Sequence, residues 1–272
     1  MIRVTWTGAA GLQFETDKEI FLIDPYHTRV DIFNTLLGSI SPDKTAVDTH
    51  LPVMENIGAI IVGHTHSDHA LDVPYIASRS KCKLVGSESL NTLMELSSMP
   101  NRVRVCSGGE TELLGDGVSV TMIRSAHGLV AFGKAPFQGE IQVTGTLPMK
   151  ANGYRAGTVF APKLQLHDTV FLHVGSANFV EKEMEGHTCD VLFLCVPGWK
   201  KRKGYPQRLI EMTRPQTVVL FHHDDISKPH IKGTRTKSPP FTDIKGMIKA
   251  IKTHSPQLEV IVPEVYDTLN FE

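Results

Sequence analysis

The stretch Val62-Gly63-His64-Thr65-His66-Ser67-Asp68-His69-Ala70-Leu71-Asp72 places three histidines and one aspartate within six positions. It follows the apolar run at residues 57–62, whose length and composition predict a buried strand. Gly63 gives the backbone freedom to turn, so we expect the polar side chains on a loop at the tip of a strand, before a helix that opens near Ala70. A strand holds such a loop still while its side chains converge.

The residue types in this loop suit a metal ion. Imidazole nitrogens and carboxylate oxygens bind Zn²⁺, and imidazole also binds iron and other first-row metals. His64 and His66 are two positions apart, so in an extended loop they point the same way and can hold one ion. Asp68 and His69 turn toward a second point nearby. A His-rich surface turn without a ligand is the alternative, but H-x-H-x-D-H after an apolar strand is far more specific than a lone histidine.

This pattern resembles the signature of the metallo-β-lactamase superfamily, and the resemblance extends over nearly the whole chain. The chain is most similar to the branch of metal-dependent hydrolases that includes ascorbate-phosphate lactonases and N-acylphosphatidylethanolamine phospholipase D. The resemblance implies a four-layer α/β/β/α sandwich with the metal site at one edge, between the sheets. The strand and helix patterns alone predict only an α/β fold. We expect a single hydrolase domain over residues 1–272.

Two further ligands are expected at the tips of other strands. His127 follows the predicted strand at residues 118–124, and it is the expected third partner of His64 and His66. The resemblance likewise assigns it to the first metal. His222 and His223 follow the predicted strand at residues 217–221. Because side chains alternate along an extended segment, only one of these two can face inward, and the residues alone do not choose between them. The resemblance aligns His222 with the ligand, which makes Asp68, His69 and His222 the second site.

Two positions are interpreted through the resemblance alone. Asp24 ends a predicted strand and precedes a proline; an ordinary turn explains it as well, but the resemblance places an acid here behind the metals, where it orients their ligands. The family usually has Gly-Asp after the strand at residues 169–174, and that aspartate bridges both metals. Here Ser176 follows Gly175. We therefore expect the first site to bind more tightly than the second.

Residues 132–162 form a long irregular segment rich in glycine, and such segments in compact domains are often functional. We interpret it as a flap over the metals, with Tyr154 and Arg155 as candidate substrate contacts; a solvated excursion is the alternative. The basic run Lys200-Lys201-Arg202-Lys203 has two interpretations, a solvated loop or an anchor for an anionic substrate.

Composition limits the function further. The chain has 272 residues, a formal net charge of −1 and 41% hydrophobic residues. A near-neutral charge argues against a nucleic-acid partner bound through broad electrostatics. The four cysteines form no C-x-x-C pair, and we expect buried reduced thiols, as in a reducing cytosol. No signal peptide or transmembrane run is visible, so a cytoplasmic location is expected.

The resemblance implies a metal-dependent hydrolase that uses a metal-bound hydroxide to cleave an ester-type bond, either a phosphodiester or a lactone. Zn²⁺ is the expected cofactor, as one or two ions, with Mn²⁺ or Fe²⁺ as alternatives. Asp68 would hold the attacking water or accept its proton. The expected substrate is a small-molecule or lipid-like anion.

Three other classes of protein are alternatives to a hydrolase. Di-iron redox relatives carry Glu at the place of His66 and usually a flavin domain, and nuclease relatives carry extra domains and basic surfaces; none of these features is present. The third is a degenerate domain that binds a single ion with little or no catalysis, and Ser176 makes this the main alternative. The substrate and the oligomeric state are not determined by the sequence.

Overall fold

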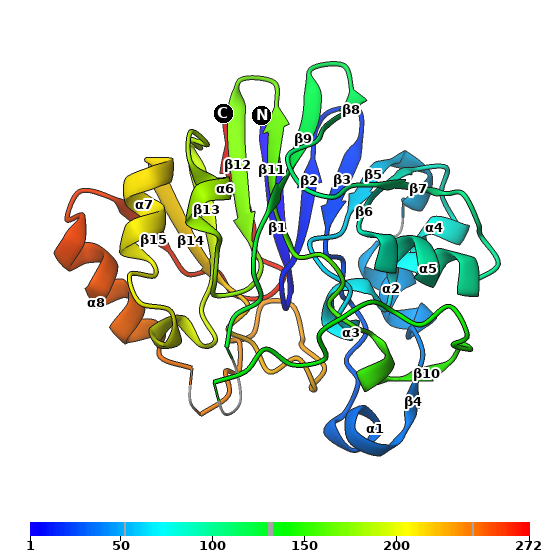
Figure 1. The fold of residues 1–272 in the computed structure, drawn as a ribbon. Helices are drawn as coiled ribbons and strands as arrows, with labels where there is room; N and C mark the ends of the chain where they lie inside the picture. The colour runs from blue at the N-terminus through cyan, green and yellow to red at the C-terminus, as the bar shows by residue number, and fades with distance from the viewer. Residues whose placement is uncertain (52, 130–132, 241) are drawn as a thin grey trace.

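The structure is a computed structural model that describes residues 1–272 apart from residues 52, 130–132 and 241. Figure 1 shows two large sheets in the middle of the molecule, with helices on both outer sides. Each sheet has seven strands among the described residues. The predicted four-layer α/β/β/α sandwich is therefore confirmed.

The first sheet has the strand order β16-β1-β2-β3-β5-β6-β7. Its neighbours are antiparallel from β16 to β3 and parallel from β3 to β7. The strands are β1 (Ile2–Gly8), β2 (Gly11–Glu15), β3 (Ile20–Ile23), β5 (Ile57–Ile61), β6 (Lys83–Gly86), β7 (Val103–Val105) and β16 (Thr268–Phe271).

The second sheet has the order β15-β14-β13-β12-β11-β9-β8. It is parallel from β15 to β12 and antiparallel from β12 to β8. Residues 160–162, which the sequence interpretation placed at the end of the flap, are instead the start of the interior strand β11, so that boundary was wrong. The strands are β8 (Thr111–Gly115), β9 (Val118–Arg124), β11 (Phe160–Leu166), β12 (Thr169–Val174), β13 (Val191–Cys195), β14 (Thr217–Phe221) and β15 (Glu259–Ile261).

The helices and a small ribbon complete the fold. The sequence pattern predicts a helix over residues 241–254; residue 241 lies outside the described residues, and the helix begins at Ile244, capped by Asp243. No helix in the described part of the chain combines the length and apolarity needed to cross a bilayer. The elements are α1 (Ile32–Leu37), α2 (Lys44–His50), α3 (Ser67–Ala70), α4 (Val73–Ser78), α5 (Glu88–Leu96), α6 (Glu181–Met184), α7 (Gln207–Thr213), α8 (Ile244–His254), the 3₁₀ turns η1 (Met54–Asn56), η2 (Ala151–Gly153) and η3 (Trp199–Lys201), and the ribbon β4 (Ser39–Ile40) with β10 (Met149–Lys150).

Two hydrophobic clusters hold the layers together. The larger lies between the sheets and includes aromatic edge contacts such as Phe14 with Phe171, whose ring centroids are 5.1 Å apart. The smaller packs helices of the N-terminal half against the first sheet, around Ile60 and Leu93. All four cysteines are buried and free, as predicted. This packing aligns the carboxyl ends of β3, β5, β9, β12 and β14 at one edge of the sandwich, where the predicted ligands lie.

Candidate metal centre

The loop after β5 begins with a close approach between Gly63 and Asp24. The Gly63 amide donates a hydrogen bond of 2.6 Å to Asp24 Oδ1, and a Cβ at Gly63 would lie 3.0 Å from Asp24 Oδ2. Gly63 does not have a positive φ, so the glycine serves this contact rather than the turn that the sequence suggested. The helix also opens earlier than predicted, because α3 begins at Ser67.

The first candidate site is formed by His64, His66 and His127. One nitrogen from each ring lies within 4.8 Å of the others. His64 Nε2 and His66 Nδ1 are 3.1 Å apart. Two ligands on a tetrahedral Zn²⁺ with Zn–N bonds of 2.0–2.1 Å are separated by about 3.3 Å, so this pair fits one ion. The structure therefore brings together the three histidines predicted for the first metal.

These imidazoles are ready to act as neutral ligands. Burial lowers the pKa of His64 well below its usual value, and burial and His127 lower the pKa of His66 to about 4. Burial also lowers the pKa of His127. His127 Nδ1 donates to the carbonyl oxygen of Gly128 at 2.7 Å, which leaves Nε2 with a free lone pair. In addition, His66 Nε2 is buried without a partner among the described residues.

The second candidate site is formed by Asp68, His69 and His222, whose donor atoms also lie within 4.8 Å of one another. Asp68 Oδ2 is 3.4 Å from His222 Nε2 and 3.7 Å from His69 Nε2. Burial alone would raise the pKa of Asp68, but His69 and His222 hold it below its usual value. The carboxylate is therefore ionised at neutral pH, as a metal ligand requires.

Of the two adjacent histidines, His222 faces the candidate metal site and His223 does not. His222 has a φ of +59°, which breaks the alternation of an extended chain and turns its ring toward Asp68. His223 is buried on the other side, where its ring lies 4.6 Å from that of Trp6 and its Nε2 is 3.2 Å from the carbonyl oxygen of Pro263. Packing against Trp6 explains why a second histidine stands here.

Asp24 lies behind the second site, in the place that the resemblance implied. It is fully buried, and its Oδ2 accepts a 2.8 Å hydrogen bond from His69 Nδ1. His69 Nε2 is thereby directed toward Asp68. Asp24 also forms a third candidate metal group with His64 and His69, but both of its oxygens already accept hydrogen bonds. This geometry favours an orienting role.

The resemblance places Ser176 where the family has a bridging aspartate. Its Oγ accepts a 2.8 Å hydrogen bond from the Gly128 amide, next to His127. The hydroxyl therefore steadies the loop that carries His127 and supplies no negative charge. The predicted ordering of the two sites, with the first tighter, stays a prediction.

We expect metal affinity at the second site to rise with pH more steeply than at the first. Burial opposes protonation of His69, but Asp24 and Asp68 raise its pKa above 6.5, whereas His64 and His66 are already neutral. The proton on His69 stabilises the metal-free protein below pH 6.5, and this contribution is lost as pH rises through the raised pKa. A metal must displace that proton, so affinity should rise by up to about tenfold per pH unit until it levels off. Calorimetric titrations at several pH values measure both slopes; equal slopes would contradict the prediction.

The irregular segment before β11 is tied to the metal loop. The Thr65 amide donates to the carbonyl oxygen of Ala156 at 3.1 Å, and the Thr65 hydroxyl donates to that of Arg155. The ring of Phe137 lies 6.2 Å from that of His66. The segment thus passes beside the first site, although residue 132, its predicted start, lies outside the described residues. A covering role stays a prediction.

The two residues predicted to contact substrate, Tyr154 and Arg155, lie in different surroundings. Tyr154 is 2% exposed and belongs to the smaller hydrophobic cluster, so the prediction that it contacts substrate was wrong. Its side chain fills the space between the segment and the helices. The Arg155 guanidinium donates to the carbonyl oxygen of Gln138 at 3.2 Å, within the same segment. Its role toward substrate stays a prediction.

The basic run after β13 is engaged with acidic neighbours. Lys200 pairs with Asp243 at 2.5 Å, and Arg202 lies 3.9 Å from Glu181. The four side chains are between 31% and 65% exposed, so solvent screens these ion pairs and they are worth little. The arrangement favours the solvated-loop interpretation over the substrate anchor.

Two groups of polar residues near the site were not singled out from the sequence. Asp72 is fully buried and accepts hydrogen bonds from the amides of His27 and Thr28 at 2.6 and 2.9 Å. Arg29 and Asp224 form a buried ion pair of 2.7 Å. Asp72 belongs to the quoted motif and directly precedes α4, so an acidic residue at the expected start of a helix was a usable signal. Nothing local marks Arg29, because its partner lies 195 residues away.

Known proteins were compared with this chain at the level of sequence. No protein-family model matches it. It is 27% identical over 134 residues to a UPF0173 metal-dependent hydrolase from Cereibacter sphaeroides, a match that covers 49% of this chain and 52% of that protein. It is 25% identical over 253 residues to another from Paracoccus denitrificans, covering 88% of this chain and 96% of that protein. The matched region thus spans about half the length of the first relative and nearly all of the second.

Solved structures show the same fold. A metallo hydrolase from Ignicoccus hospitalis superposes with a TM-score of 0.61 at 15% identity, covering 100% of this chain and 98% of that one. The metallo-beta-lactamase fold protein YhfI from Bacillus subtilis gives 0.61 at 12%, covering 99% and 100%. CmlA, a diiron beta-hydroxylase from Streptomyces venezuelae, also gives 0.61 at 12%, covering 99% of this chain and 54% of its own.

Fold and sequence together identify the class. The chain has the metallo-β-lactamase fold, and its sequence is similar to UPF0173 metal-dependent hydrolases. The curated relatives named above are called metal-dependent hydrolases. None of the proteins named here is called a lactonase or a phospholipase D, so that finer resemblance stays a prediction.

Proposed function

We propose that this protein is a metal-dependent hydrolase that cleaves an ester-type bond, a phosphodiester or a lactone, in an anionic small-molecule or lipid-like substrate. One observation carries the proposal: six predicted ligands from three separate strand ends converge in two adjacent groups. The names of the sequence relatives support the reaction class. The choice between phosphodiester and lactone rests on the resemblance seen in the sequence.

The donor set fits Zn²⁺, with Mn²⁺ and Fe²⁺ as alternatives. His64, His66 and His127 would hold the first ion, and Asp68, His69 and His222 the second. A bound ion would supply Lewis acidity, which polarises the scissile bond and lowers the pKa of water to about 7. The fold alone does not select hydrolysis, since CmlA shares it. His66 stands where the di-iron redox relatives are expected to carry Glu, which favours the hydrolase.

The protein's own residues would prepare the reaction. Because the neighbouring imidazoles keep Asp68 ionised, its oxygens can accept a hydrogen bond from the attacking water and orient it. Asp24 fixes the ring of His69, and Gly128 fixes the ring of His127. The segment beside His66 would exclude bulk water from the first site.

The function is tested by hydrolysis of a generic phosphodiester and of a simple lactone. Turnover should disappear with a chelator and return with Zn²⁺ or Mn²⁺. Metal-loaded protein that turns over neither substrate would support the alternative, a degenerate domain that binds one ion. High iron content with visible absorbance would instead indicate redox chemistry.

Replacing Ser176 by aspartate is expected to raise occupancy of the second site. The variant introduces the carboxylate that the family uses as a bridge, at the cost of the hydrogen bond from the Gly128 amide. Metal analysis after dialysis should show the ratio of metal to protein moving toward two. Ser176→Ala is the matched control, since it loses the same hydrogen bond without adding a charge. An unchanged ratio in Ser176→Asp would count against the prediction.

A further inference from the structure

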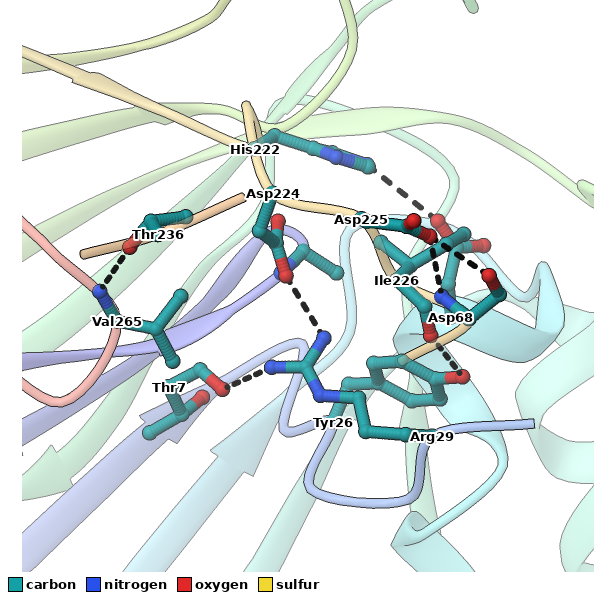
Figure 2. A network of polar contacts seen from close by, with 12 residues as sticks. Thr7, Tyr26, Arg29, Asp68, His222, Asp224, Asp225, Ile226, Thr236 and Val265 are labelled. Carbon is teal, nitrogen blue, oxygen red and sulfur yellow. Dashed lines mark hydrogen bonds and ion pairs between the residues drawn. The ribbon is translucent and has the colours of Figure 1, made fainter. Parts of the chain in front are cut away.

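A buried ion pair joins three separate segments at the edge of the metal centre. Arg29 Nη1 lies 2.7 Å from Asp224 Oδ2, and the two side chains are 6% and 5% exposed. Arg29 Nη2 donates to the carbonyl oxygen of Thr7 at 3.0 Å (Figure 2). The Ala9 amide donates to Asp224 at 2.9 Å. The pair thus fixes the loop after β14 to the turn between β1 and β2 and to the loop after β3.

His222 lies two positions before Asp224 on the same stretch of chain. Figure 2 shows the two side chains leaving it in different directions, His222 toward Asp68 and Asp224 toward Arg29. His222 adopts the left-handed conformation, with a φ of +59°. A residue other than glycine keeps this conformation only where its surroundings impose it. His223 is anchored by Trp6 and Pro263 on the other side of the chain, and Asp224 is the next residue fixed by the buried ion pair.

The ring of His222 is held differently from those of the other ligands. His69 Nδ1 is bonded to Asp24 and His127 Nδ1 to the carbonyl of Gly128. The corresponding atom of His222, Nδ1, is buried and has no partner among the described residues. Metal-binding histidines almost always have such a partner, which sets the direction of the ring. Apart from the contact of its Nε2 with Asp68, the direction of the His222 ring therefore depends on the backbone that carries it.

The turn between β1 and β2 is shaped around the guanidinium. A Cβ at Gly8 would lie 1.8 Å from Arg29 Nη2, and Gly8 has a φ of +98°. A bulkier residue would therefore displace Arg29. The planar guanidinium contacts both Thr7 and Asp224, and this two-point contact fixes direction in a way that a lysine cannot fully match.

We propose that the Arg29–Asp224 pair positions His222 for the second metal ion, in place of the missing partner at Nδ1. Arg29 and Asp224 are positioning residues that touch neither the ion nor the substrate. A buried ion pair contributes little net stability compared with a well-packed apolar pair, so its value here is directional. The inference rests on the proposed function only in requiring that a second ion binds.

Stepwise titration of the metal-free protein with Co²⁺, followed by visible absorbance and calorimetry, tests the inference. Wild type should show a tight and a weaker binding event. Asp224→Asn should weaken the second event by about 10- to 100-fold, the usual effect of losing a residue that orients a ligand, and leave the first unchanged. Arg29→Lys keeps the positive charge but not the two-point contact, and it should weaken the second event less than Asp224→Asn does. Asp225→Asn breaks the neighbouring surface pair with Lys228, 2.9 Å apart, and should change neither event.

The first event serves as the internal check on folding. Equal weakening of both events in Asp224→Asn would show a general structural effect and overturn the inference, as would no change in either. If Asp224→Asn does not fold, Arg29→Lys decides, because it must weaken the second event alone. A wild type with one binding event also overturns it. A wild type that binds two ions and hydrolyses nothing contradicts the proposed function and leaves this inference standing.

Discussion

Replacing His66 by alanine should abolish tight metal binding and lower turnover by about 10³-fold or more. His66 supplies Nδ1 at 3.1 Å from His64 Nε2, and two histidines cannot hold a tetrahedral ion as tightly as three. A catalytic ion supplies several kcal/mol of transition-state stabilisation, and each 1.36 kcal/mol is about tenfold in rate. Metal analysis and initial rates on the same protein preparation measure both effects.

His187→Ala is the control for His66→Ala, since His187 belongs to none of the candidate metal groups among the described residues. It should keep its metal content and its rate. Near-normal turnover in His66→Ala would mean that the reaction, if any, does not depend on the first site.

Replacing Asp24 by alanine should destabilise the metal-free protein by about 3–5 kcal/mol, the range found when one partner of a buried ionic contact is removed. The Gly63 amide and His69 Nδ1 would both be left buried without their acceptor. His69 would also lose the contact that raises its pKa and directs its ring. Urea unfolding of the metal-free protein measures the first effect, and metal titration measures the weaker second site.

Asp24→Asn separates these two effects. The amide oxygen can still accept from the Gly63 amide, but the side chain no longer carries the charge that raises the pKa of His69. We expect a smaller loss of stability than in Asp24→Ala and a similar loss of affinity at the second site. If Asp24→Ala is as stable as the wild type, the buried carboxylate is dispensable for stability and the prediction is contradicted.

Much of the site could be predicted because each ligand follows a strand. The motif from His64 to His69 follows β5, and His127 follows β9. Strand tips are recognisable from short apolar runs that end in polar residues and glycine, and parallel strands bring their carboxyl ends to one edge. The metal groups were therefore accessible to reasoning from sequence pattern together with family resemblance.

Other features depend on tertiary packing and left no local signal. The choice between His222 and His223 is made by a positive φ and by the ring of Trp6, more than 200 positions away. Tyr154 was predicted to contact substrate because it lies in an irregular segment interpreted as a flap over the metals, yet its side chain is buried in the smaller hydrophobic cluster. Strand β11 was hidden because a proline stands within it and loop-like residues precede it.

Anomalous diffraction from crystals grown with Zn²⁺ or Mn²⁺ tests the central claim most directly. We expect a strong peak among the ring nitrogens of His64, His66 and His127, and a weaker one among Asp68, His69 and His222. Metal peaks elsewhere in the protein, or none at these six residues at saturating metal, would contradict it.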